Sequence, residues 1–122
     1  MNAGDAFIPS HPYDHLYVVV SDPALDSDNI VLLNFTSYEP EEEDCCIANA
    51  GEHQRITKRS CIRYKDGRVS SVAHINKLIE TGTMRRQKSV TLGLLERIRE
   101  GASKSDFLPE GCRRVLEDQG LL

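Results

Sequence analysis

Two histidines and a pair of hydroxyl residues stand where this sequence could perform acid–base chemistry. His15 directly precedes an apolar run over residues 16–20, and Thr36 and Ser37 directly follow a second run over residues 30–35. His53 comes later, in the segment Gly-Glu-His-Gln-Arg over residues 51–55. Histidine exchanges protons near neutral pH, and hydroxyls position a substrate by hydrogen bonding. We interpret His15, Thr36, Ser37 and His53 as candidate catalytic residues and expect them to share one concave face.

The residues after His53 are strongly basic. Between His53 and Arg68 there are six basic residues and one acidic residue. Cleavage of RNA without a metal needs a base for the 2′-OH proton, an acid for the leaving oxygen, and cations that hold the charged phosphorane. A histidine with nearby Arg, Lys and hydroxyls has the chemistry that such a cleavage requires. We interpret four residues as candidate RNA-binding residues: Arg55, Lys58, Arg59 and Arg63.

Each of these residues also has a purely structural interpretation. A histidine at a strand end is often solvent-facing or hydrogen-bonded to the backbone, and Thr36 and Ser37 are typical turn-capping residues. Lys and Arg over residues 55–68 are also typical of an edge strand that avoids sheet-to-sheet aggregation. Aromatic residues that could stack on bases are few in this region, namely Tyr38 and Tyr64.

Several common catalytic signatures are absent from the sequence. It has no Walker loop, GxGxxG, HExxH or GxSxG motif, which argues against nucleotide hydrolysis, zinc proteolysis and hydrolase-fold ester chemistry. The four cysteines include no CxxC spacing, so we expect reduced thiols and no structural zinc. No cofactor is expected.

The net charge of −4 conceals a marked asymmetry between the two halves of the chain. Residues 1–52 contain eleven acidic residues and no Lys or Arg, whereas residues 53–122 contain fifteen basic and eight acidic residues. Either the halves neutralise each other in the fold, or a basic surface meets an acidic partner or a phosphate backbone. An acidic stretch over residues 39–44 is either a solvated loop or a contact for a basic partner.

The two apolar runs are the elements that must position these side chains. We predict strands over residues 15–21 and 29–36, joined by a turn rich in Asp, Pro and Ser. Both strands are apolar on both faces, which indicates burial on both. A link this short favours an antiparallel pair.

The remaining pattern predicts a single α+β domain over residues 1–122. Residues 1–14 are expected to be irregular, and residues 83–88 to form a basic connection. Asp66-Gly67 predicts a hairpin turn, with Val69 as a candidate start of a short fifth strand. Further strands are expected over residues 45–49 and 60–64, and helices are expected from Val72 to before Gly82, over 91–102 and over 109–119.

No secretory signal is visible, and the longest apolar run is five residues. A bilayer span needs about 20. We therefore expect a cytoplasmic protein with no membrane partner.

The order of these segments resembles the PemK/MazF toxin family. The resemblance rests on HLYVVVSDP followed by NIVLLNFTS, then ITKRSCIRY, INKLIETG and the C-terminal helix, over residues 13–119. It implies an SH3-like small antiparallel β-barrel followed by two or three short helices. It also implies a homodimer that cleaves single-stranded RNA without metal and is held by an antitoxin protein; DNA is not an expected partner.

Thr36 and Ser37 match the hydroxyl pair at the strand end of that family. His15 precedes the strand where the family normally places a functional arginine, and this chain has no arginine before Arg55. Either His15 or the basic cluster over residues 55–59 performs the role of that arginine, or the barrel binds RNA without cutting it. The alternative function is a non-enzymatic protein-interaction module that uses the acidic loop or an apolar barrel edge.

Overall fold

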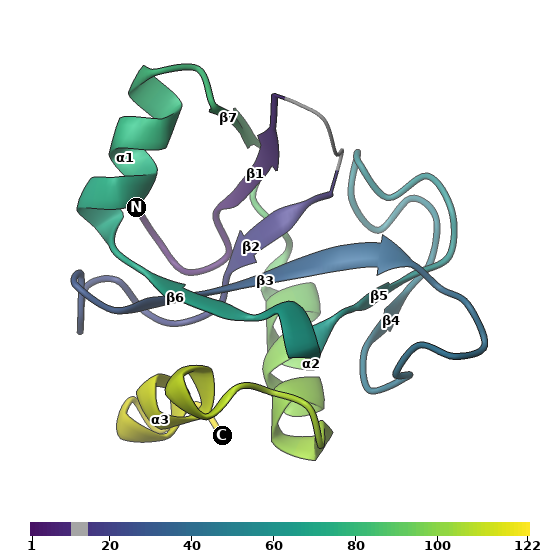
Figure 1. The fold of residues 1–122 in the computed structure, drawn as a ribbon. Helices are drawn as coiled ribbons and strands as arrows, with labels where there is room; N and C mark the ends of the chain where they lie inside the picture. The colour runs from purple at the N-terminus through teal and green to yellow at the C-terminus, as the bar shows by residue number, and fades with distance from the viewer. Residues whose placement is uncertain (11–14) are drawn as a thin grey trace.

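The computed structural model describes residues 1–10 and 15–122 and shows an antiparallel sheet with helices packed against it (Figure 1). The sheet has seven strands in the order β4-β5-β3-β2-β1-β7, with β6 also paired to β3. All strand pairs are antiparallel. The predicted α+β class is confirmed.

The central pair is β2 (Tyr17–Val19) and β3 (Ile30–Ser37), as predicted from the two apolar runs. Val18 lies opposite Leu33, and both side chains are fully buried. Successive side chains of a strand point to opposite faces, and here each face has its own apolar cluster. Burial on both faces explains why these segments are apolar at nearly every position.

Helices cover both faces of this sheet (Figure 1). α1 (Val72–Glu80) packs on one cluster through Ile75, while α2 (Leu92–Lys104) and α3 (Glu110–Asp118) pack on the other. The Ser71 and Thr91 side chains cap α1 and α2 by accepting hydrogen bonds from backbone N–H groups. Among the described residues, no helix has the length and apolar character needed to cross a membrane.

β3 pairs with β2 along one edge and with two different strands along the other edge. β6 (Arg68–Ser70) pairs with its first half and β5 (Ser60–Ile62) with its last residues. The hairpin predicted at Asp66-Gly67 is therefore wrong, because β5 and β6 both pair with β3 and the 3₁₀ turn η1 (Tyr64–Asp66) joins them. Tyr64 explains the difference: its fully buried hydroxyl donates to the Ile98 carbonyl 2.7 Å away, which directs this turn into the core.

Two predictions of irregular chain are wrong. Within residues 1–14, β1 (Ala6–Pro9) is a strand, and within residues 83–88, β7 (Met84–Gln87) is another. Each supplies the other with a partner, with Ala6 opposite Gln87, and β1 also pairs with β2. The rest of the expected irregular segment, residues 11–14, lies outside the described residues.

The strand path has two ends, β4 (Ile47–Ala48) and β7. In the described part of the chain no hydrogen-bonded ladder joins β4 to β7. The structure therefore shows a seven-stranded sheet, and a closed barrel remains a prediction.

The four cysteines are free thiols in different environments. Burial raises the pKa values of the Cys46, Cys61 and Cys112 thiols to about 11. The half-buried Cys45 has a pKa raised by burial and then by the carboxylate of Glu43. Since the thiolate is the reactive form, all four are protonated near neutral pH and three are also inaccessible.

We expect a disulfide reagent to modify a single thiol of the native protein slowly, and all four after unfolding in guanidinium. Cys45 is the expected target because it is the least buried of the four. Counting released chromophore in wild type and in Cys45→Ser tests this. A native Cys45→Ser protein that still reacts as fast as wild type would contradict the assignment.

Candidate functional site

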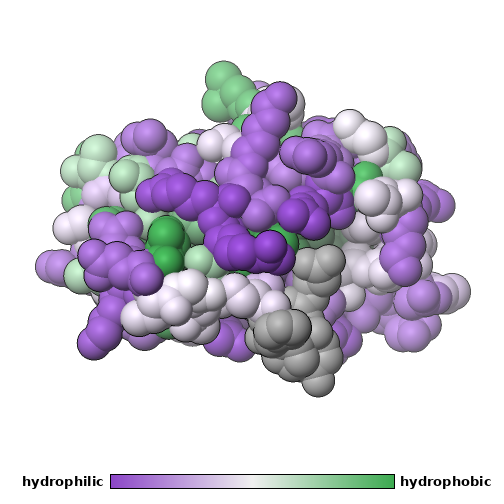
Figure 2. All heavy atoms as spheres, turned by 90° about the horizontal axis from the view of Figure 1, so that it is seen from above, coloured by the Kyte–Doolittle hydropathy of each residue, from purple (hydrophilic) through white to green (hydrophobic). Residues whose placement is uncertain are grey.

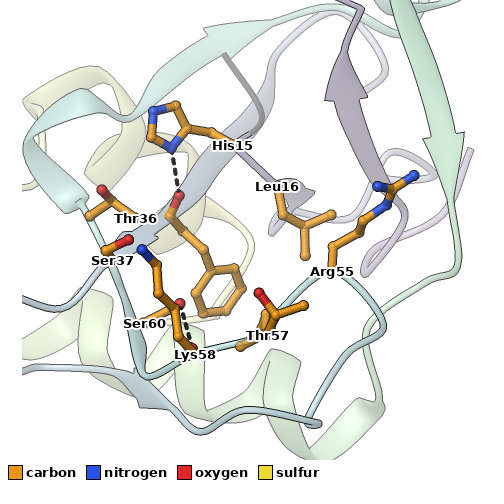
Figure 3. A pocket seen from close by; sticks show the side chains of 10 residues that line it. His15, Leu16, Thr36, Ser37, Arg55, Thr57, Lys58 and Ser60 are labelled. Carbon is orange, nitrogen blue, oxygen red and sulfur yellow. Dashed lines mark hydrogen bonds between the residues drawn. The ribbon is translucent and has the colours of Figure 1, made fainter.

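A pocket of about 370 Å³ opens at the end of the sheet where β3 finishes and the chain enters β2 (Figure 3). Three segments that are distant in the sequence form it: the start of the β2 segment, the end of β3 and the loop before β5. Its lining includes five of the predicted site residues, His15, Thr36, Ser37, Arg55 and Lys58, together with Leu16, Phe35, Ile56, Thr57 and Ser60. We call it the His15 pocket.

The β2–β3 register brings His15 beside the hydroxyl pair. Tyr17 lies opposite Asn34, so the residues before Tyr17 run along the residues after Asn34. His15 Nδ1 is 3.1 Å from the Phe35 carbonyl oxygen. Because a carbonyl only accepts, this contact assigns a hydrogen to Nδ1. The backbone of β3 thus orients this imidazole.

The basic wall of the His15 pocket is a loop stabilised by its own hydrogen bonds. Gly51 has φ +93°, a left-handed conformation that glycine adopts without steric cost, and its N–H donates to the Ile56 carbonyl. Ile56 is 3 % exposed and anchors the loop in the main core cluster. Arg55, Thr57 and Lys58, on either side of it, are exposed and line the pocket.

α2 stabilises the start of this loop. Arg97 forms an ion pair with Glu52 and donates to the Ile47 carbonyl, and Glu52 also accepts from the Asn49 N–H at 2.7 Å. The hydrogen bond from Arg97 and then that from Asn49 lower the pKa of the Glu52 carboxyl. The loop is thereby fixed to both β4 and α2.

His53 is not part of the pocket, so the prediction that it shares a concave face with His15 and Thr36 is wrong. It is 6 % exposed, and both ring nitrogens contact backbone groups. Nδ1 accepts from the Arg55 N–H at 3.0 Å, and Nε2 lies 2.5 Å from the Lys88 carbonyl. Because Nδ1 accepts and a carbonyl cannot donate, the ring is neutral with its hydrogen on Nε2. It joins the loop to the residue after β7.

Removing this connection is expected to loosen the loop. In His53→Ala the Arg55 N–H loses its acceptor, which should lower the free energy of unfolding by about 1–3 kcal/mol and speed exchange of that amide. His53→Asn is the matched control, since its side-chain oxygen can accept from the N–H two residues ahead while the bond to Lys88 is lost. Hydrogen exchange and urea unfolding measure both effects. Equal exchange of the Arg55 amide in the two variants would contradict this role.

Arg55 and Lys58 stand on different sides of the pocket. Lys58 lies with His15, Thr36 and Ser37, whereas Arg55 lies across from them (Figure 3). Arg55 Nε donates to Gln87 Oε1 of β7 at 2.8 Å. Within residues 1–10 and 15–122, neither Arg55 nor Lys58 has an ion pair with a carboxylate. Their charges remain available to an anion.

The other two predicted RNA-binding residues lie outside the lining of the pocket. The Arg59 guanidinium packs over the Tyr38 ring, 5.1 Å from its centroid. Arg63 forms ion pairs with Glu42 at 3.1 Å and Asp66 at 3.7 Å. The acidic loop is thus partly neutralised by its own chain, as one of the two interpretations of the charge asymmetry predicts.

Sequence reasoning missed one polar residue of the pocket, Thr57, and the connection of the pocket to β7 through Gln87. Thr57 lies between the predicted Arg55 and Lys58, so extending the basic cluster to the hydroxyl within it would have found this residue. Gln87 had no signal, because the strand that carries it was not predicted. In the described part of the chain, His, Cys, Asp and Glu form no group able to hold a metal ion.

Comparison of the chain with protein-family models, with curated proteins and with solved structures gives no match.

Proposed function

We propose that this protein binds single-stranded RNA in the His15 pocket and cleaves it through attack of a ribose 2′-OH on the adjacent phosphate. The observation that carries the proposal is the convergence in one pocket of a histidine, a hydroxyl pair and two cations from three distant segments. These groups supply a proton acceptor, hydrogen-bond donors and positive charge, and water supplies the proton for the leaving oxygen.

The reaction assigns a role to each group. His15 takes the 2′-OH proton as the 2′ oxygen bonds to phosphorus. The P–O5′ bond breaks as a water molecule protonates the leaving O5′, and the hydroxide so formed takes the proton back from His15. The products are a 2′,3′-cyclic phosphate and a free 5′-OH. Lys58 and Arg55 balance the charge that builds on the phosphorane. Thr36 and Ser37 donate hydrogen bonds that position the phosphate or the ribose.

The proposal includes kinship with the PemK/MazF family and an SH3-like barrel. Support comes from β3, which ends in the hydroxyl pair and pairs with β2, β5 and β6. The cations of the 55–58 loop supply the charge that an arginine provides at the position of His15 in that family. A homodimer, an antitoxin partner and a cytoplasmic location belong to the same proposal.

A non-enzymatic interaction module is the second candidate. Phe107 is 61 % exposed and shares a surface depression with Glu41, Glu42 and Glu43 of the acidic loop and with Arg63 and Lys65. An exposed ring beside charges of both signs suits a protein partner that presents an apolar residue flanked by charged residues.

Incubation of the protein with end-labelled, mixed-sequence single-stranded RNA in EDTA tests the proposed function, with DNA of the same sequence as the control. We expect cleavage of the RNA to products with 2′,3′-cyclic ends, and no cleavage of DNA, which lacks the attacking hydroxyl. RNA that is bound but not cut would remove the catalytic part of the proposal. RNA that is neither bound nor cut would favour the interaction module.

A further inference from the structure

β7 is the terminal strand of the sheet, and its sequence Met-Arg-Arg-Gln places two neighbouring arginines on opposite faces. Met84 lies in the apolar cluster under α1, and Arg86 is on that same side, 5.5 Å from the centroid of the Phe7 ring. Arg85 and Gln87 therefore point to the other side. Gln87 is the residue that accepts the hydrogen bond from Arg55 of the His15 pocket.

The two arginines also differ in charge compensation. Arg86 forms an ion pair with Asp5 at 3.5 Å. Arg85 is exposed, and the ion pairs found in residues 1–10 and 15–122 do not include it. Arg85 therefore presents a full positive charge on the pocket side of β7, and Arg86 does not.

Position and charge together extend the pocket along the sheet edge. Residues two apart on a strand are separated by about 7 Å. Arg85 is therefore the next residue along this face of β7 beyond Gln87, which accepts the hydrogen bond from Arg55. Lys58, Arg55 and Arg85 then form a row of cations that begins in the pocket and continues along β7. The face that carries β7 in Figure 1 shows hydrophilic side chains across its middle in Figure 2.

We propose that Arg85 extends the His15 pocket into a track for the RNA backbone and binds a phosphate next to, and not at, the reacting one. This inference rests on the proposed function and names a further substrate contact. Contacts to phosphate oxygens carry no sequence information, so a phosphate bound by Arg85 adds affinity without sequence preference. An RNA too short to reach β7 does not use it.

Matched variants of the two neighbouring arginines test the track. Affinity is measured by fluorescence anisotropy with a 2′-O-methyl RNA of about 12 nucleotides, a length within the usual range of single-strand sites. This RNA lacks the attacking hydroxyl and stays intact. The salt concentration is varied from about 50 to 300 mM, because each phosphate contact contributes about 0.7 to the slope of log affinity against log salt.

We expect Arg85→Gln to weaken binding roughly tenfold at low salt and to reduce the slope by about 0.7. Arg86→Gln should leave both nearly unchanged, and binding of a dinucleotide should not depend on Arg85. Both residues are exposed, and urea unfolding checks that both variants fold.

Equal losses in the two variants would show a general effect of net charge and overturn the track. An unchanged Arg85→Gln, beside a wild type that binds RNA in a salt-dependent way, would overturn the track and leave the proposed function intact. A wild type that binds no RNA at any salt concentration would overturn both.

Discussion

Substitution of Gly101 by alanine is expected to destabilise the protein by about 3 kcal/mol or more, at the upper end of the usual cost of overpacking. Gly101 lies on the buried face of α2. A Cβ at this position would stand 2.2 Å from the Tyr64 hydroxyl oxygen and 2.8 Å from the Cys45 carbonyl oxygen. Tyr64 is fully buried and its hydroxyl is hydrogen-bonded to α2, so it has no open space into which to move.

Urea unfolding of Gly101→Ala measures this cost, and Gly93→Ala is the control on the same helix. Among the described residues, nothing lies within 4 Å of a Cβ at Gly93, so alanine there should be neutral or stabilise the helix by up to about 1 kcal/mol. Adding Tyr64→Phe to Gly101→Ala removes the nearest atom and should recover part of the loss. A Gly101→Ala protein as stable as wild type would show that α2 does not pack this closely on Tyr64.

Substitution of His15 is expected to have the largest effect on activity. If His15 transfers the proton, His15→Asn should lower the rate of RNA cleavage by roughly 100- to 10,000-fold. Asparagine places its amide nitrogen near the position of Nδ1, so it can still donate to the Phe35 carbonyl. Folding and RNA affinity should therefore change little, and the loss should fall on kcat rather than KM.

His53→Asn is the matched control for His15→Asn. His53 acts through the backbone of Arg55 and lies outside the pocket lining, so its asparagine variant should retain most of the cleavage rate. Single-turnover cleavage by the two variants, with affinity measured on uncleavable RNA, separates the two histidines. The catalytic assignment of His15 fails if His15→Asn cleaves at the wild-type rate, or if His53→Asn loses as much.

The central strands were predictable because burial on both faces requires an apolar residue at nearly every position. β1 and β7 were not, for two physical reasons. β1 is four residues long, and its partner in β7 is far away in the chain. β7 carries two arginines, and its strand conformation comes from pairing at the sheet edge rather than from apolar periodicity.

In the candidate site, too, some features were predictable from local sequence and others were not. His15, Thr36 and Ser37 were predictable as neighbours because the start of one strand meets the end of the next in an antiparallel pair. The burial of His53 was not, since it depends on β7, an element that local sequence did not reveal. The Arg63–Glu42 ion pair likewise joins residues on two separate loops, and no local pattern predicts it.

The pairing of β1 with β7 also has a consequence for protein synthesis. Ala6 can pair with Gln87 only after this residue, roughly 80 residues later in the chain, has been synthesised. Closing so long a loop is entropically costly. A growing chain that has not yet released β7 from the ribosome lacks both the edge strand and the carbonyl of Lys88 that holds His53. The basic wall of the pocket therefore takes its final form only when most of the chain has emerged, so a truncated or nascent product would lack the assembled site.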